Sequence, residues 1–179
     1  SEGPACRMVV LNPQPRPESS ISAKSESLNN LSVVTELVCR EQRVLFTGDI
    51  EREALTRLTH SGNSAHIALL KLPHHGAKSS LERRWLETIR PAVGVVSAGR
   101  RNPYGHPAGE VLAAYQAVET QVWRTDRDGA IWADLDLTRQ ELSMHSTREW
   151  ILQPALPSAD IWSVEQDNLR RLWRRWNWT

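Results

Sequence analysis

VLFTGDIEREALTRLTHSGNSAHIALLKLPHHG, residues 44–76, determines the fold class and the candidate site of this chain. The stretch opens with VLFTGD (Val44–Asp49) and closes with LLKLPHHG (Leu69–Gly76), and each half is an apolar run followed at once by residue types that bind metals. Short apolar runs bounded by turn residues predict buried strands. Open α/β sheets place their ligands at the edge where such strands end. The sequence therefore predicts one site formed by the carboxylate of the first half and the two imidazoles of the second.

The bulk composition indicates one folded domain without a preferred partner. The 179 residues are enough for a domain with its own core. The formal net charge is +1, but Arg far outnumbers Lys among the 22 basic residues, which suits phosphate binding and equally fits codon usage. No apolar run of about 18 residues and no signal-peptide pattern is present. Because the chain also starts without Met, we interpret it as a piece of a longer protein.

Hydrophobic periodicity predicts an α/β fold with a mixed sheet flanked by helices. Strands are expected at residues 8–11, 31–39, 43–46, 67–72, 92–97, 121–124, 130–135 and, at an edge, 137–145. Helices are expected at residues 51–58, 80–89 and 109–118.

Three local patterns refine these elements. Residues 31–39 and 43–46 are expected to pair as an antiparallel hairpin. Asp128-Gly129 is a strong hairpin dipeptide and predicts a second hairpin between the strands on either side of it. Ser79 and Glu82 resemble a capping box, with Ser79 as the N-cap of the helix that follows.

The chain divides by composition into a domain and an extension. Residues 1–145 are interpreted as the domain, with 12–30 as an exposed loop rich in Pro, Ser and Glu. Residues 146–179 form a Trp/Arg-rich extension that holds most of the eight Trp residues. A basic, aromatic helix in this extension suits a membrane interface or a nucleic-acid backbone, although packing back on the domain is favoured over both.

The two cysteines leave two possibilities open. If the first strand pairs antiparallel with the second, Asn12 faces about Ser32 and Cys6 lies close to the position opposite Cys39. A disulfide is then geometrically possible and implies an oxidising compartment. Two free thiols near a core are an equally good interpretation.

The candidate metal ligands have ordinary structural alternatives. Asp49 taken alone is best explained as the N-cap of the helix that follows it. The pair His74-His75, followed by Gly76 at a strand end, shifts the balance, because two imidazoles and a carboxylate on neighbouring strand ends suit a divalent metal.

Four motifs in series resemble the later half of the metallo-β-lactamase-like domain of ComEC-type DNA internalisation proteins. They are VLFTGD, LLKLPHHGAKSS, AVGVVSAGRRNPYGHP and VWRTDRDGAI, and NNLSVV ahead of them resembles a fifth. The resemblance covers roughly Asn29–Asp134 and implies the C-terminal half of an αββα sandwich. It further implies a soluble domain of a cell-membrane protein of natural competence, on the periplasmic or extracytoplasmic side, attached to a channel for single-stranded DNA.

The same resemblance implies roles for individual residues. Asp49 would bridge two Zn or Mn ions, and His75, with His74 beside it, would bind one of them. His106, in the YGHP motif, would bind or protonate a phosphate. An exposed loop histidine before a helix that starts with Pro is a close alternative for His106.

Further residues are implied to contact DNA, and no small-molecule cofactor is expected. The candidate substrate contacts are Asn30, Ser32, Ser79, Ser80, Arg100 and Arg101. The serine pair would hold a phosphate at a helix N-terminus, although capping alone is favoured for it. The arginine pair would steer a DNA backbone.

One departure from the family pattern keeps three functions open. The fold's main metal motif, a His-x-His-x-Asp-His run, is absent, since the six histidines are at 60, 66, 74, 75, 106 and 145. The first function is metal-dependent hydrolysis of the non-imported DNA strand, completed by a preceding half. The others are hydrolysis of a small phosphodiester and a non-catalytic module that guides DNA or docks to the channel. Metal binding by this segment alone is expected to be weak.

Overall fold

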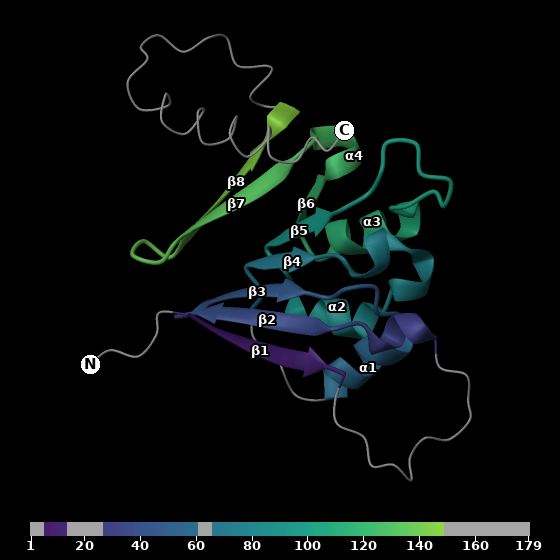
Figure 1. The fold of residues 1–179 in the computed structure, drawn as a ribbon, viewed down its shortest axis with the longest axis horizontal. Coiled ribbons are helices and arrows are strands. Elements are labelled where there is room, and N and C mark those ends of the chain that lie inside the picture. Colours follow the sequence, from purple (N-terminus) through teal and green to yellow (C-terminus); the bar gives the residue numbers. More distant parts are fainter. Residues whose placement is uncertain (1–5, 14–26, 61–65, 149–179) are drawn as a thin grey trace, which may run out of the picture. The chain divides into compact units, whose positions relative to one another are not determined.

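The computed structural model describes residues 6–13, 27–60 and 66–148 (Figure 1). The strands of the main sheet are β1 (Cys6–Asn12), β2 (Val34–Cys39), β3 (Gln42–Phe46), β4 (Leu69–Lys71), β5 (Val93–Val96) and β6 (Gln121–Arg124). A separate pair consists of β7 (Ile131–Asp136) and β8 (Glu141–Ser146). The helices are α1 (Arg52–His60), α2 (Arg83–Ile89), α3 (Gly109–Ala117) and α4 (Thr125–Asp128). Three 3-10 turns are η2 (Leu28–Leu31), η3 (Pro73–Gly76) and η4 (Lys78–Ser80).

The main sheet is mixed, as the sequence predicted. Its strand order runs from β1 to β6 without reversal. The β1, β2 and β3 strands pair antiparallel, whereas β3, β4, β5 and β6 pair parallel. The helices α1, α2 and α3 are the crossovers between parallel strands, and right-handed crossovers along an unreversed order place all three on one face. None of the described helices is both long enough and apolar enough to cross a membrane.

The hydrophobic core lies between this face and the three helices. Strand side chains that point to it alternate with those that point away, as the strand period requires. The central buried members are Val34, Leu45, Ile50, Leu55, Leu70, Leu86, Val96 and Val111. This core fixes the positions of the strand ends that carry the candidate site.

The β7–β8 hairpin covers part of the opposite face of the sheet. An apolar cavity lies between the two, lined on the sheet side by Leu37, Val44, Phe46, Leu69, Lys71 and Val95. The hairpin is also tied to the β2–β3 turn, because Arg40 donates to the Leu137 carbonyl at 3.2 Å and Gln42 to the Gln140 carbonyl at 2.9 Å. The edge strand predicted for residues 137–145 corresponds to β8, which pairs with β7.

The predicted hairpin around Asp128-Gly129 is wrong. β6 pairs in parallel with β5, and the chain then turns through α4 before β7 begins. Side chains stabilise this turn, since the Asp128 carboxylate accepts from the Arg124 amide at 2.8 Å and Asp126 pairs with the Arg124 guanidinium. The Thr125 hydroxyl donates to the Ala98 carbonyl at 2.9 Å. These contacts outweigh the intrinsic preference of the dipeptide.

The first strand settles the question of the cysteines. Cys6 lies opposite Cys39 in the β1–β2 register and forms a disulfide with it, so the interpretation as free thiols is wrong. A register shift between Val10 and Asn12 places Asn12 opposite Val34 rather than Ser32.

Other local predictions are corrected or fall outside the described residues. Glu82, not Ser79, is the N-cap of α2, because its carboxylate accepts a hydrogen bond from the Trp85 amide. The exposed loop was predicted for residues 12–30, but Asn12 and Asn30 at its two ends are buried. The middle of that loop, and the extension from residue 149 on, lie outside the described residues.

Candidate functional site

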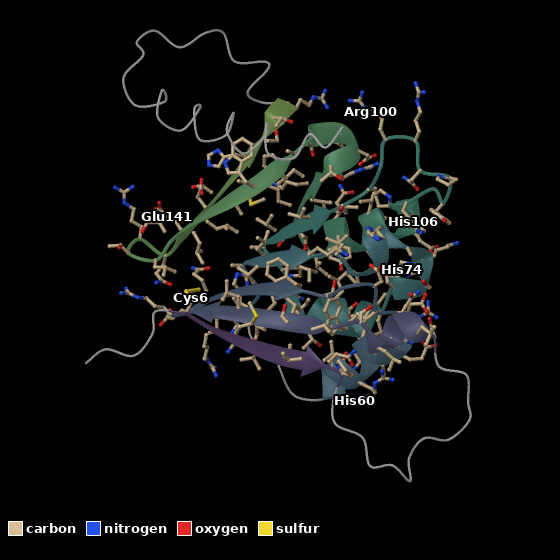
Figure 2. All side chains as sticks on the ribbon, in the orientation of Figure 1. Cys6, His60, His74, Arg100, His106 and Glu141 are labelled. Carbon is tan, nitrogen blue, oxygen red and sulfur yellow. A yellow bond between two sulfur atoms is a disulfide. The ribbon has the colours of Figure 1, made fainter. Side chains whose placement is uncertain are left out.

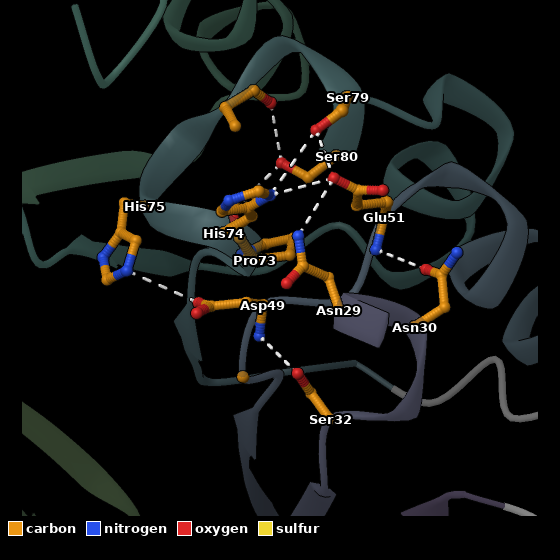
Figure 3. A network of polar contacts seen from close by, with 12 residues as sticks. Asn29, Asn30, Ser32, Asp49, Glu51, Pro73, His74, His75, Ser79 and Ser80 are labelled. Carbon is orange, nitrogen blue, oxygen red and sulfur yellow. Dashed lines mark hydrogen bonds and ion pairs between the residues drawn. The ribbon is translucent and has the colours of Figure 1, made fainter. Parts of the chain in front are cut away.

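The candidate site lies where β3, β4 and β5 end. Parallel strands have their carboxyl ends at the same edge of the sheet, so residues that follow them come together. Asp49 follows β3, the histidine pair lies in η3 after β4, and Ser97 follows β5. Figure 3 shows His75 turned toward Asp49 and His74 turned toward Glu51.

The TGD and HHG turns are joined to each other by hydrogen bonds. The buried Thr47 hydroxyl donates to the Lys71 carbonyl at 2.7 Å. The His74 amide donates to the Gly48 carbonyl at 3.1 Å, and the Lys71 ammonium donates to the same carbonyl at 3.0 Å. The two motifs therefore form one unit, although 24 residues separate Thr47 from Lys71.

Both histidines have a backbone conformation that is rare for residues other than glycine. The φ angle is 44° at His74 and 55° at His75. Such conformations cost of order 1–3 kcal/mol each and persist where the surroundings impose them, most often at functional sites. Here the bond from the His74 amide to Gly48 and the packing of Gly76 impose them.

Gly76 allows the HHG turn to lie directly against the loop that carries His106. Its φ is 78°, and a Cβ atom at this position would lie 2.7 Å from the Pro107 Cβ. The Ala108 amide also donates to the Gly76 carbonyl at 2.9 Å. The chain after β5 is thus brought to the chain after β4, and the His74 and His106 rings lie 5.9 Å apart.

Asp49 and His75 form a pair with the hydrogen-bonding pattern of a metal ligand set. His75 Nδ1 lies 2.7 Å from the Ser97 carbonyl, which can only accept, so this nitrogen carries the proton. Nε2 lies 3.5 Å from Asp49 Oδ1 and, in the neutral ring, is the nitrogen that can bind a metal. Metal-binding histidines usually donate their other N–H to such a carbonyl. A carboxylate and a neutral imidazole that face each other suit a shared divalent cation.

Lys71 already places a positive charge beside this pair. Its ammonium lies 3.7 Å from Asp49 Oδ1. Burial lowers the pKa of Lys71, and Asp49 opposes that effect. No third His, Cys, Asp or Glu completes a metal-binding group within residues 6–13, 27–60 and 66–148. Asp49 and His75 can therefore supply two ligands to a metal ion, which is fewer than a complete coordination sphere needs.

Glu51 is a site residue that the sequence analysis missed. Its Oε1 accepts hydrogen bonds from Ser79 Oγ at 3.0 Å and from Asn29 Nδ2 at 3.3 Å, and lies 3.2 Å from His74 Nδ1. Burial alone would raise the pKa of Glu51, but the bonds from Ser79 and Asn29 and the nearby His74 hold it below its usual value. The carboxylate therefore orients His74. The available signal was its place in TGDIE, two residues after Asp49, at the start of the helix predicted for residues 51–58.

Asn30 and Ser32, which are predicted to contact substrate, accept hydrogen bonds from the backbone of the TGD segment and the residues that follow it. The buried Asn30 accepts from the Glu51 amide at 2.8 Å, and Ser32 Oγ accepts from the Asp49 amide at 3.2 Å. Asn12, at the end of β1, donates to the carbonyls of both residues, at 3.0 and 2.7 Å. These bonds tie the first strand to the site, and a substrate contact by either side chain stays a prediction.

The remaining predicted contacts are distributed around the site. The Ser80 hydroxyl is buried and bonded to the Pro73 and Ala77 carbonyls, whereas Ser79 contacts Glu51. His106 is partly buried, and burial, followed by the proximity of His74 and His75, lowers its pKa. Arg100 and Arg101 are exposed on the loop before it. The roles assigned to all these residues stay predictions.

Three known proteins are similar to part of this chain. A 105-residue stretch, 59% of the chain, is 32% identical to ComE operon protein 3 of Bacillus subtilis, of which it covers 14%. A 105-residue stretch is 30% identical to Recombination protein 2 of Haemophilus influenzae, covering 13% of it. A 133-residue stretch is 28% identical to the uncharacterized protein YcaI of Escherichia coli, covering 17% of it. No family model matches the sequence. The resemblance to ComEC-type competence proteins is thus confirmed as a partial, distant similarity.

Proposed function

We propose that this chain is part of a DNA-uptake protein of natural competence and contributes Asp49 and His75 to metal-dependent hydrolysis of the DNA strand that is not imported. The approach of His75 Nε2 to Asp49 Oδ1, 3.5 Å apart, with Nδ1 bound to the Ser97 carbonyl, carries this proposal. The partial similarity to ComE operon protein 3 and to Recombination protein 2 supports the DNA substrate. In this proposal the fold is the later half of a metallo-β-lactamase-like domain.

The proposed roles follow from the positions of the side chains. Asp49 and His75 hold one side of a cation site whose other ligands come from outside the described residues. A divalent metal bound there supplies Lewis acidity to a phosphate and to a water molecule. The rings of His74, beside Glu51, and His106 lie 5.9 Å apart in an edge-to-face arrangement and can donate to phosphate oxygens. Burial, followed by the proximity of His74 and His75, lowers the pKa of His106, which favours the neutral ring as a proton acceptor.

The Cys6–Cys39 disulfide supports an extracytoplasmic location for this segment. Disulfides persist in oxidising compartments and are rare in the cytosol. Incoming DNA would meet the site on that side before transport. The membrane part of the same protein is the proposed partner.

A non-catalytic module that guides DNA is the second candidate function. The position of the Lys71 ammonium, 3.7 Å from Asp49 Oδ1, favours it, because this charge competes with a metal for the same oxygen.

The test is cleavage of labelled single-stranded DNA with Mn²⁺ or Zn²⁺, made with the full-length gene product. A small aryl phosphodiester is assayed in parallel to separate a nuclease from a hydrolase of small esters. Asp49→Ala and His75→Ala should each lower the DNA cleavage rate at least about a hundredfold. His60→Ala, on the exposed end of α1, serves as the control.

Two outcomes would contradict the nuclease proposal. One is cleavage that survives Asp49→Ala. The other is the absence of metal-dependent cleavage although DNA binding is retained, which would establish the guiding module instead. Faster turnover of the aryl ester than of DNA would reassign the substrate.

A further inference from the structure

The loop from Gly99 to Pro107 presents an exposed aromatic ring that the candidate site does not use. Tyr104 is 79% exposed. One face of its ring stacks on His106, with centroids 5.9 Å apart and planes inclined by 19°. His106 in turn lies 5.9 Å from His74 (Figure 2). Tyr104 is therefore one ring removed from the site, and its outer face is open to solvent.

Asn102 holds this loop in shape. Its Nδ2 donates to the Gly99 carbonyl at 2.9 Å and to the His106 carbonyl at 2.7 Å. Its Oδ1 accepts from the His106 amide at 2.9 Å. A ring on a braced loop loses little conformational freedom when a ligand binds. Tyr104 is thus a preformed contact surface.

Four exposed arginines gather around α4 and the start of this loop. We call them the arginine surface: Arg100, Arg101, Arg127 and Arg148. Arg100 donates to the Asp126 carbonyl at 3.5 Å, and Arg148 donates to the Arg127 carbonyl at 3.4 Å, so both side chains contact α4. Figure 2 shows Arg100 on the same loop as His106, farther from His74.

The charges of the arginine surface are available for an external anion. Within the described part of the chain, no carboxylate forms an ion pair with any of its four members. The acid closest in sequence, Asp126, is engaged by Arg124 through two bonds of 3.0 and 2.7 Å. Guanidinium groups that form no ion pair with a carboxylate are suited to phosphate.

We propose that Tyr104 and the arginine surface bind single-stranded nucleic acid, with a base stacked on the outer face of Tyr104 and phosphates held by the arginines. This inference rests on the proposed function and names the substrate contacts of that site. An aromatic platform beside a basic track is the combination by which proteins hold single strands without sequence preference. A duplex keeps its base faces stacked inside, so the Tyr104 ring selects the single strand.

The test of stacking uses fluorescence anisotropy of a labelled oligothymidine of about 20 nucleotides, with EDTA present, and the 179-residue chain. A second strand has its bases replaced by abasic sites. Tyr104→Leu should weaken binding of oligothymidine about tenfold and leave binding of the abasic strand unchanged. Tyr104→Phe keeps the ring and should bind both strands as the parent chain does.

The test of the arginine surface compares two double variants. Arg100→Gln/Arg101→Gln should reduce the slope of log K against log salt by about 1.4, or about 0.7 for each phosphate contact of a single strand. Arg83→Gln/Arg84→Gln, an exposed pair on α2 with the same charge change, should leave that slope unchanged.

The proposal is overturned if Tyr104→Leu weakens both strands equally, or if the two arginine variants behave alike. Binding to phosphatidylserine vesicles that is tighter than binding to DNA and unaffected by Tyr104→Leu would also overturn it, in favour of a membrane contact. Since EDTA removes hydrolysis from the measurement, loss of nuclease activity with binding intact refutes only the proposed function.

Discussion

Glu51 is the residue whose contacts define one half of the site. An ionised carboxylate only accepts hydrogen bonds, so its position 3.2 Å from His74 Nδ1 favours the tautomer with the proton on that nitrogen. His75 has the same tautomer for a different reason, its bond to the Ser97 carbonyl. The adjacent histidines thus contact two different carboxylates: His75 contacts Asp49, and His74 contacts Glu51.

Replacement of Glu51 should release the His74 ring. We expect Glu51→Ala to give His74 a mixture of tautomers and to lower the free energy of unfolding by about 1 kcal/mol, because Ser79 and Asn29 lose their acceptor. Long-range ¹H–¹⁵N spectra recorded at about pH 8.5, where imidazoles are neutral, report the tautomer. Glu51→Gln keeps an acceptor oxygen and should largely preserve it.

The matched control is Glu53→Gln, in the first turn of α1, which begins directly after Glu51. Glu53 accepts from Asn30 Nδ2 at 3.0 Å, and no contact joins it to His74 in the described structure. A shift of the His74 signals in Glu53→Gln as large as in Glu51→Ala would show that the helix, rather than the Glu51 carboxylate, orients the ring.

Sequence reasoning brought Asp49 and His75 to one sheet edge but did not single out Glu51, for a physical reason. A carboxylate and histidines directly after apolar runs can be placed at a sheet edge from the strand pattern alone. A carboxylate in the first turn of a helix is ordinary, and its role here depends on Ser79 and Asn29, which are distant in sequence. Only the packing of α1 against η4 and η2 reveals that contact.

At the level of elements, the η3 turn and the loop before α3 act together. Gly76→Ala would place a Cβ atom 2.7 Å from Pro107 at a φ of 78°, so one segment must shift. We expect the variant to lower the free energy of unfolding by about 1–3 kcal/mol and to separate the His74 and His106 rings. Urea unfolding measures the first effect, and NOEs between the two rings measure the second.

Gly109→Ala provides a sharp comparison for Gly76→Ala. No atom lies within 4 Å of a Cβ at this position, which begins α3. Alanine there should be neutral or stabilising by a few tenths of a kcal/mol. Equal destabilisation by the two substitutions would contradict the close approach at Gly76.

The disulfide fixes β1 to β2 at one end. It closes a loop of 33 residues, so Cys6→Ser/Cys39→Ser should lower the free energy of unfolding by about 2–4 kcal/mol. Urea titration of the parent chain with and without dithiothreitol should reproduce this difference, while the double variant should be insensitive to the reductant. Sensitivity of the double variant would mean that the reductant acts elsewhere.

Element order could be predicted from the sequence better than element partners. Period and turn residues located every strand, because each strand has its own apolar pattern. The partner of β6 was wrong, since Asp128-Gly129 favours a hairpin locally, whereas Asp126, Asp128 and Thr125 make side-chain bonds that build α4. Whether Cys6 and Cys39 form a disulfide could not be decided from the sequence, because it depends on the register of β1 against β2.

On the scale of the whole molecule, the described residues cover the sheet face opposite the helices only in part. Val10, Thr35 and Phe46 form one row across β1, β2 and β3, and the two apolar members are 61% and 45% exposed. Exposed apolar surface of this kind drives association. We expect the chain to self-associate over a roughly hundredfold rise in concentration, measured by sedimentation equilibrium.

Val10→Thr/Phe46→Thr should reduce that association and preserve the strands, since threonine keeps a high β propensity. Val33→Thr removes an apolar side chain that is 59% exposed outside the sheet and should change little. A parent chain that stays monomeric throughout, or a Val33 variant that dissociates as readily, would contradict this use of the sheet face.

The covalent bond at Cys6 also determines how the domain carries mechanical load. Tension on the chain ahead of Cys6 passes through sulfur to Cys39 and enters β2, so it bypasses the hydrogen bonds of β1. Without the bond, the same pull would peel β1 from its end, one residue pair at a time, toward Asn12. Since Asn12 supports Asn30 and Ser32 under the site, the disulfide isolates the site from force.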